Sequence, residues 1–101
     1  MSKSREWLVE HIRLAILETI DLDPGHSCNH VIIAHALESS RAFSLADEEV
    51  KEHLEWLAGK DLVVTETVGQ FRIARLTTDG ERAARGLKVV KGVAKPDPRG
   101  E

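Results

Sequence analysis

Three residues with metal-binding side chains stand at alternate positions early in the chain. They form the motif H-x-C-x-H at His26, Cys28 and His30, and His35 follows nearby. Imidazole and thiolate groups suit zinc, but established zinc motifs pair two such clusters at fixed spacings, and this chain has one cluster and one cysteine. His30 and His35 are five residues apart, a spacing that places them poorly for sharing one face of a helix. We therefore predict no metal and no cofactor, with Cys28 buried as a small apolar residue and the histidines partly exposed.

Cys28 and a neighbouring histidine also have the composition of a nucleophile and its base. Such a site would need groups that stabilise an oxyanion and a third residue that orients the base, and no recognisable spacing supplies them. A glycine-rich phosphate loop is absent as well, because Gly69, Gly80 and Gly86 are isolated turn residues. We predict that the protein is not an enzyme.

The charged residues divide the chain into an acidic front and a basic end. Residues 1–60 contain six Lys or Arg and eleven Asp or Glu, whereas residues 61–101 contain eight and six. The contrast is sharpest in LADEEVKEHLEWLAGKDLV, residues 45–63, where one helical stretch carries five acids against Lys51. Such a helix would repel the phosphate groups of DNA. The net charge of the whole chain, −3, also argues against a protein that coats nucleic acid without sequence preference.

The remaining composition is typical of one small globular domain. The chain has 101 residues, of which 42% are hydrophobic and 31% charged. A single cysteine cannot form an internal disulfide, which favours a reducing cytoplasm. No apolar run approaches the roughly 20 residues of a membrane span, and MSKSREW lacks the apolar core of a secretion signal. We expect a cytoplasmic protein with no membrane partner.

Apolar periodicity predicts the order helix, helix, helix, hairpin, helix and tail. The four helices are expected over residues 5–20, 27–39, 44–59 and 77–87, and the hairpin over 62–76. The predicted caps are Ser27, a capping box at Ser44 and Asp47, and a second box at Thr78 and Glu81. The residues expected to face inward from the last three helices are Val31, Ile33, Ala34, Leu37, Val50, Leu54, Leu57, Ala83, Ala84 and Leu87.

This order predicts an α+β fold, mostly α, of the winged helix-turn-helix class: three helices, a two-stranded wing, a C-terminal helix and an extended tail. The domain is expected over residues 1–87. Residues 88–101 contain two glycines, two prolines and scattered charge, which favours a basic, flexible tail.

Two short sequence motifs resemble those of winged-helix regulators. LEWLAGKDLVVTE is similar to the junction LxxLxxxGLV that joins the recognition helix to the wing, although Asp61 stands where glycine is usual. LTTDGERAARG is similar to the phrase LTxxGxxxAxG that follows the wing. The residues that match are Leu54, Leu57, Leu62, Val63, Leu76, Thr77, Gly80, Ala84 and Gly86.

A wider resemblance, over nearly the whole chain, is to small winged-helix proteins of Mu-like transposable phages and prophages. It rests on DPGHSCNHVIIAHAL, VKEHLEWLAGKDLV and GERAARGLKVVKGVAKPDPRG, whose most distinctive residues are Gly86, Gly92, Val93, Lys95, Pro96, Pro98 and Arg99. The resemblance implies a phage-encoded accessory protein in a bacterial host, active in transcriptional regulation or DNA handling. It implies no particular catalytic or binding residue.

Two functions remain open, and the fold class together with the phage resemblance favours the first. In the first, the protein binds double-stranded DNA through basic residues of the wing, the last helix and the tail, which are Arg72, Arg75, Arg82, Arg85, Lys88, Lys91 and Lys95. In the second, it binds another phage protein through the acidic third helix, at Glu48, Glu52 and Trp56. The first helix has more apolar residues than one core-facing stripe needs. Either a few of them are simply exposed beside a wide stripe, or Trp7, Leu14 and Leu17 form a homodimer contact.

Overall fold

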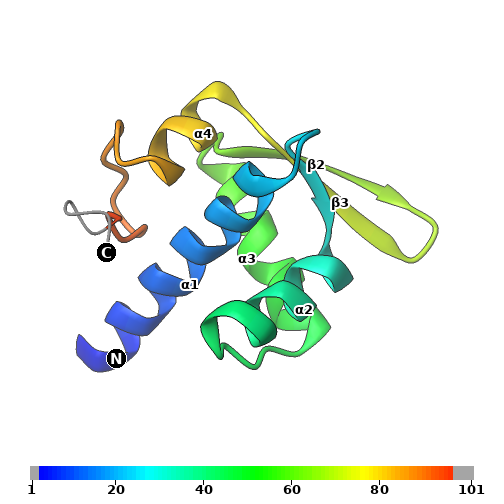
Figure 1. The fold of residues 1–101 in the computed structure, drawn as a ribbon, viewed down its shortest axis with the longest axis horizontal. Helices are drawn as coiled ribbons and strands as arrows, with labels where there is room; N and C mark the ends of the chain where they lie inside the picture. The colour runs from blue at the N-terminus through cyan, green and yellow to red at the C-terminus, as the bar shows by residue number, and fades with distance from the viewer. Residues whose placement is uncertain (1–2, 97–101) are drawn as a thin grey trace.

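The computed structural model describes residues 3–96, which form a mostly helical α+β fold (Figure 1). Its elements are, in order, α1 (Lys3–Leu22), β1 (Ser27–Asn29), α2 (His30–Arg41), α3 (Asp47–Gly59), β2 (Val63–Val68), β3 (Phe71–Leu76) and α4 (Thr78–Ala84). The expected α+β class, four helices and hairpin are confirmed. None of the described helices is long and apolar enough to cross a membrane.

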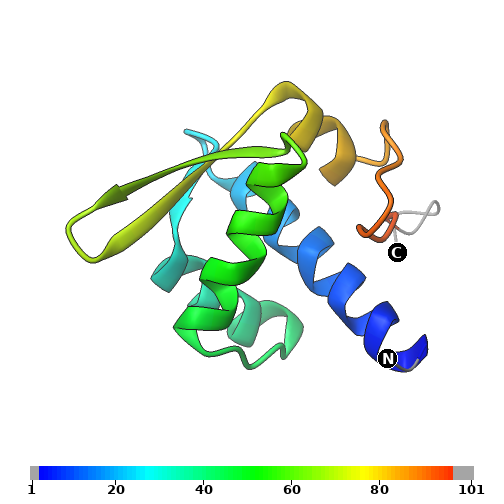
Figure 2. The same ribbon diagram turned by 180° about the vertical axis from the view of Figure 1, so that it is seen from behind.

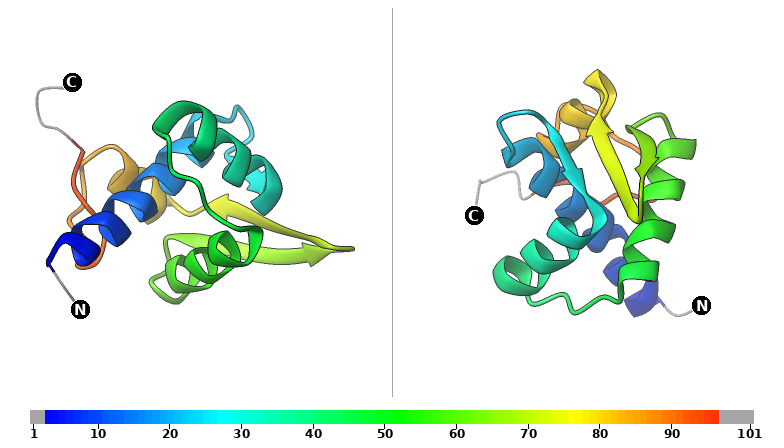
Figure 3. Two further views of the ribbon diagram at one scale, coloured as in Figure 1. Left: turned by 90° about the horizontal axis from the view of Figure 1, so that it is seen from below. Right: turned by 90° about the vertical axis from the view of Figure 1, so that its right-hand side faces the viewer.

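The sheet has three antiparallel strands in the order β1-β3-β2. The β2–β3 hairpin turns at Gly69, whose φ of 59° lies in the left-handed region that glycine adopts without strain. Figure 3 shows this hairpin projecting beyond the helices. On its other side β3 pairs with β1, with Cys28 opposite Ala74. β1, which follows the loop after α1, therefore attaches this part of the chain to the hairpin through its pairing with β3.

The prediction of a helix beginning at Ser27 was wrong. Ser27 pairs with Arg75 in the sheet, and the helix begins only at His30. Asn29 is its N-cap, because the Asn29 side-chain oxygen accepts a 2.9 Å hydrogen bond from the backbone N–H of Ile32. A strand of three residues has too little alternation to be recognised locally, and its partner lies far along the chain.

The hydrophobic core is built around α1, which runs between α4 and α2 (Figure 2) and contacts both helices. Leu14 and Leu17 were predicted to contact a second subunit, and this was wrong, because both are buried within the chain. The homodimer predicted from them loses its basis. Trp7, by contrast, is exposed, and its ring stacks on that of His11 with centroids 3.8 Å apart.

The predicted inward faces of α3 and α4 are largely correct. Val50, Leu54 and Leu57 have no exposed surface, and Ala83 and Ala84 are buried. In α2, Ile33, Ala34 and Leu37 are also buried, as predicted. Val31 and Leu87 were placed wrongly, since both are exposed: Val31 lies on the outer side of α2, and Leu87 follows the end of α4, where Gly86 turns the chain with a φ of 78°.

Both predicted capping boxes were shifted. At α3 the Glu49 carboxylate accepts a 3.0 Å hydrogen bond from the backbone N–H of Ala46, so the helix begins at Asp47 rather than at Ser44. At α4 the N-cap is Thr77, whose hydroxyl oxygen accepts a 3.0 Å bond from the N–H of Gly80. In both helices the N-cap is the last residue with an extended backbone before the helix, and the residue type alone does not show which residue that is.

Residues 88–96 form no helix or strand, but they lie along α1. The backbone N–H of Ala94 donates to the carbonyl of Glu10 at 3.1 Å, and the Arg13 guanidinium donates to the carbonyl of Gly92 at 3.1 Å. Val93 is buried between them. These contacts show that the part of the predicted tail within the described residues is attached to the domain, whereas Pro98 and Arg99 lie outside those residues.

Candidate interaction surface

Both hairpin arginines are engaged within the chain. Arg72 forms an ion pair with Glu55 of α3, and its guanidinium donates a 2.7 Å hydrogen bond to the hydroxyl oxygen of Thr67. Arg75 lies 3.7 Å from Glu66 across the hairpin. Binding a phosphate at either arginine would therefore replace an existing carboxylate partner.

The basic residues of α4 and of the residues just after it also lie near carboxylates. Arg82 and Lys88 both approach Asp79, at 3.8 and 3.9 Å. Arg85 donates to both carboxylate oxygens of Asp21, at 3.0 and 3.1 Å, and also pairs with Glu81 at 3.2 Å. Of the seven predicted DNA-contacting residues, only the exposed Lys91 and Lys95 have no ion-pair partner within residues 3–96.

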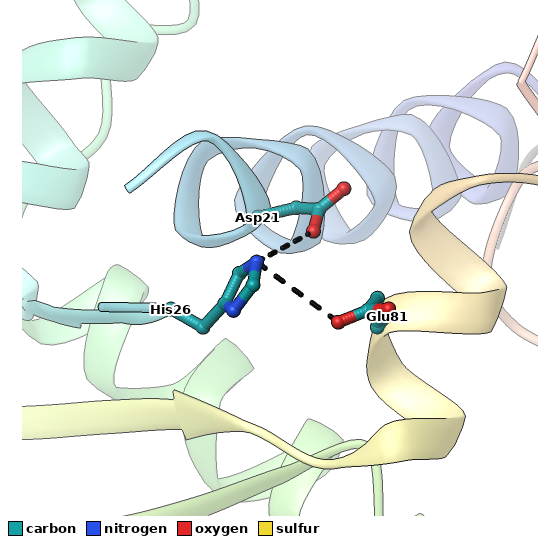
Figure 4. Close-up of side chains that lie close together, drawn as sticks. All are labelled: Asp21, His26 and Glu81. Atoms are coloured by element: carbon teal, nitrogen blue, oxygen red, sulfur yellow. Dashed lines mark ion pairs between the residues drawn. The ribbon is translucent and has the colours of Figure 1, made fainter. Parts of the chain in front are cut away.

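Figure 4 shows the group that most resembles a metal site among the described residues: Asp21, His26 and Glu81. The Nε2 atom of His26 lies 3.3 Å from the Asp21 carboxylate and 3.9 Å from that of Glu81. Arg85 already binds both carboxylates, and the hydrogen bond to Asp21 is the main reason that its pKa is raised. The geometry is that of an ion-pair cluster joining α1 to α4, with the positive charge supplied by Arg85.

The residues of H-x-C-x-H are not brought together. Cys28 packs against the core, and burial, followed by the charge of Asp23, raises the pKa of its thiol, which disfavours a reactive thiolate. His30 was expected to be partly exposed, and this was wrong: it is only 4% exposed. Its Nδ1 accepts a 3.1 Å hydrogen bond from the backbone N–H of Arg72. The His30 side chain thus bonds β3 at the point where the pairing between β1 and β3 ends.

Trp56 was predicted to be an exposed contact residue, and this was wrong. The guanidinium of Arg13 covers its ring at 3.7 Å from the centroid, and Lys60 approaches it at 5.4 Å. A Cβ at Gly92 would lie 2.6 Å from the indole, so residues 88–96 also press against it. Trp56 is therefore half-buried and joins α3 to α1 and to the C-terminal segment.

The outward side of α3 keeps its negative charge. Glu49 is used for capping and Glu55 pairs with Arg72. Asp47, Glu48 and Glu52 remain exposed, and we call these three residues the α3 acidic face. Lys51 pairs with Glu48 at 3.4 Å, but Glu48 is 81% exposed, so solvent weakens that pair.

A groove adjoins the α3 acidic face, between the start of α2, the start of α3 and the hairpin tip. We call it the α2–hairpin groove; its lining residues are His30, Val31, Asp47, Glu48, Lys51, Gln70 and Phe71. Val31 and Phe71 are 40% and 37% exposed, so the groove has apolar side chains open to solvent beside carboxylates. The sequence could not reveal it, because Val31 fitted the core pattern and the three segments are far apart in the chain.

Comparison with known proteins gives one relevant match. The chain is 32% identical over 92 residues, which is 91% of its length and 94% of the relative's, to the uncharacterized protein gp26 of Escherichia phage Mu. No family profile matches the chain, and no solved structure is significantly similar to it. Because the identity extends over almost the full length of both proteins, this chain is a Mu-like phage protein and belongs to the same family as gp26 of phage Mu.

Proposed function

We propose that the fold is a winged helix-turn-helix. The order α1, β1, α2, α3, β2, β3, α4 supports this assignment, with α2 and α3 as the helix-turn-helix, β2–β3 as the wing and β1 as the third strand of its sheet. In DNA-binding proteins of this class the second helix of the pair, here α3, enters the major groove.

We propose further that the protein is a non-enzymatic interaction module, which binds a basic surface of another phage protein through the α3 acidic face. The observation that carries this proposal is the charge of α3, the helix that would have to approach DNA. Asp47, Glu48 and Glu52 are exposed there, whereas the nearby cations Lys51 and Arg72 are each paired with a carboxylate of the same helix. A surface of this kind repels phosphate and attracts Lys and Arg.

Reversing the charge of two residues of this face is expected to abolish partner binding. In a pairwise interaction matrix against the other proteins of the same phage, the unchanged chain should bind at least one of them. Glu48→Lys with Glu52→Lys should lose that partner, because both replacements repel a basic surface. Both side chains are exposed, so folding should be retained.

The matched control is Glu6→Lys with Glu38→Lys, which makes the same change in net charge at exposed positions of α1 and α2. The control variant should bind as the unchanged chain does. Equal loss in both variants would show that only net charge matters, and the absence of any partner in the complete matrix would rule out the interaction module.

DNA association is a second candidate, favoured by the exposed Lys91 and Lys95 on the C-terminal segment. Two lysines that have no carboxylate partner within residues 3–96 could hold phosphates but would read no sequence. We expect Lys91→Ala with Lys95→Ala to remove any affinity for a random duplex measured by fluorescence anisotropy at low salt. Unchanged affinity in that variant would exclude these lysines as the DNA-contacting residues.

A further inference from the structure

The α2–hairpin groove contains a buried polar group with an unused hydrogen-bonding atom. His30 is only 4% exposed, yet it lines the groove. Its Nδ1 accepts the N–H of Arg72, so that nitrogen carries no proton, and in the neutral ring the proton must lie on Nε2. Nε2 has no hydrogen-bond partner within the described residues. His30, a lining residue of the groove, therefore keeps one N–H donor that no described residue accepts.

The apolar side chains beside His30 define a second part of the groove. Phe71 lies with its ring centroid 6.3 Å from that of His30, and Val31 is the next residue along α2. Val68, which is opposite Phe71 in the hairpin, is also exposed and continues this apolar strip. Burial of one aliphatic or aromatic side chain between Val31 and Phe71 would be favourable.

The rim of the groove determines the charge of what enters. Asp47 and Glu48 line it on the α3 side, and Glu52 lies one turn further along the same helix. The lining has two carboxylates against one cation, Lys51, so the groove keeps a net negative charge even with the Lys51–Glu48 pair formed. An acidic ligand would be repelled, whereas a ligand with Lys or Arg near its apolar group would be attracted.

We propose that the α2–hairpin groove binds a basic peptide segment of a partner protein, with one apolar side chain between Val31 and Phe71 and a backbone carbonyl on His30 Nε2. This inference rests on the proposed interaction function and adds the chemistry of the segment that is bound. Lysines or arginines on either side of the apolar residue lie against Asp47 and Glu48. Recognition thus combines a hydrogen bond, an apolar contact and charge attraction in one groove.

The test is a titration of the ¹⁵N-labelled chain with the blocked peptide GKKLKKG, followed by backbone amide and imidazole NMR. We expect saturable shifts at Val31, Gln70 and Phe71, and at the Nε2 of His30. The peptides GKKAKKG and GEELEEG should bind much more weakly, because one lacks the apolar side chain and the other reverses the charge. Phe71→Ala should weaken GKKLKKG binding about tenfold.

Val64→Ala is the matched control, since Val64 is an exposed valine of the same hairpin but does not line the groove. It should leave peptide affinity unchanged. No saturable binding of GKKLKKG, equal binding of GEELEEG, or equal effects of Phe71→Ala and Val64→Ala would overturn the proposal.

The two proposals can fail separately. If the natural partner binds the Phe71→Ala variant with unchanged affinity but does not bind the Glu48→Lys, Glu52→Lys variant, the interaction module stands and the groove does not. If the partner binds both variants with unchanged affinity, neither proposal holds.

Discussion

Replacing Gly80 with alanine is expected to lower the free energy of unfolding by about 3 kcal/mol or more. A Cβ at this position would lie 1.9 Å from the carbonyl oxygen of Leu62 and 2.9 Å from its carbonyl carbon. That oxygen also accepts the backbone N–H of Thr77, the N-cap of α4. Because backbone atoms cannot move aside as a side chain would, α4 would have to separate from the start of β2. Urea denaturation measures the effect.

Gly59 provides the control for this substitution. It ends α3, a Cβ added there would have no atom within 4 Å, and its φ is not positive. Gly59→Ala should therefore leave stability unchanged or raise it by up to about 1 kcal/mol, because alanine restricts the unfolded chain. A Gly80→Ala variant as stable as Gly59→Ala would contradict the close packing of α4 on Leu62.

Replacing Leu17 with alanine is expected to destabilise the protein by about 2–5 kcal/mol, because a fully buried leucine leaves a cavity in the core. The midpoint of unfolding should be independent of protein concentration, since Leu17 packs within its own chain. Leu22→Ala is the matched control in the same helix, at a side chain that is 83% exposed, and should change stability by less than about 0.5 kcal/mol. If light scattering showed that the unchanged chain is a dimer and that Leu17→Ala is a monomer, Leu17 would be a subunit contact after all.

Regular elements with strong local patterns could be predicted from the sequence. The spacing of Val50, Leu54 and Leu57 identified the buried side of α3, and Gly59 marked its end. The change from helical to alternating pattern located the hairpin. These features depend on residues close together in the chain, which is why local periodicity sufficed.

Features that depend on distant segments could not be predicted. β1 is a strand only because β3, which follows α2, α3 and β2 in the chain, pairs with it. The second apolar face of α1 suggested a dimer because nothing in its own sequence shows that α4 covers it. Trp56 was likewise assigned to the surface, since its cover comes from Arg13 and Gly92.

Counts of charged residues along the sequence also failed to show which charges pair with one another in the fold. The basic end of the chain suggested a phosphate-binding region, but Arg85 is paired with Asp21, which lies 64 residues earlier. The acidic surplus of α3 was visible from the sequence, and its exposure supports the interaction proposal. The groove beside it, formed by Val31 and Phe71, needed three segments to be placed together.

The most direct test of the proposed interaction surface is amide NMR mapping of the ¹⁵N-labelled chain in complex with the partner found in the interaction matrix. We predict that the shifted amides lie in the first two turns of α3, from Asp47 to Glu52, and at the hairpin tip around Gln70 and Phe71. Residues 82–95 should be unaffected. Shifts confined to residues 82–95, with α3 unchanged, would contradict the proposal that the acidic face of α3 is the binding surface.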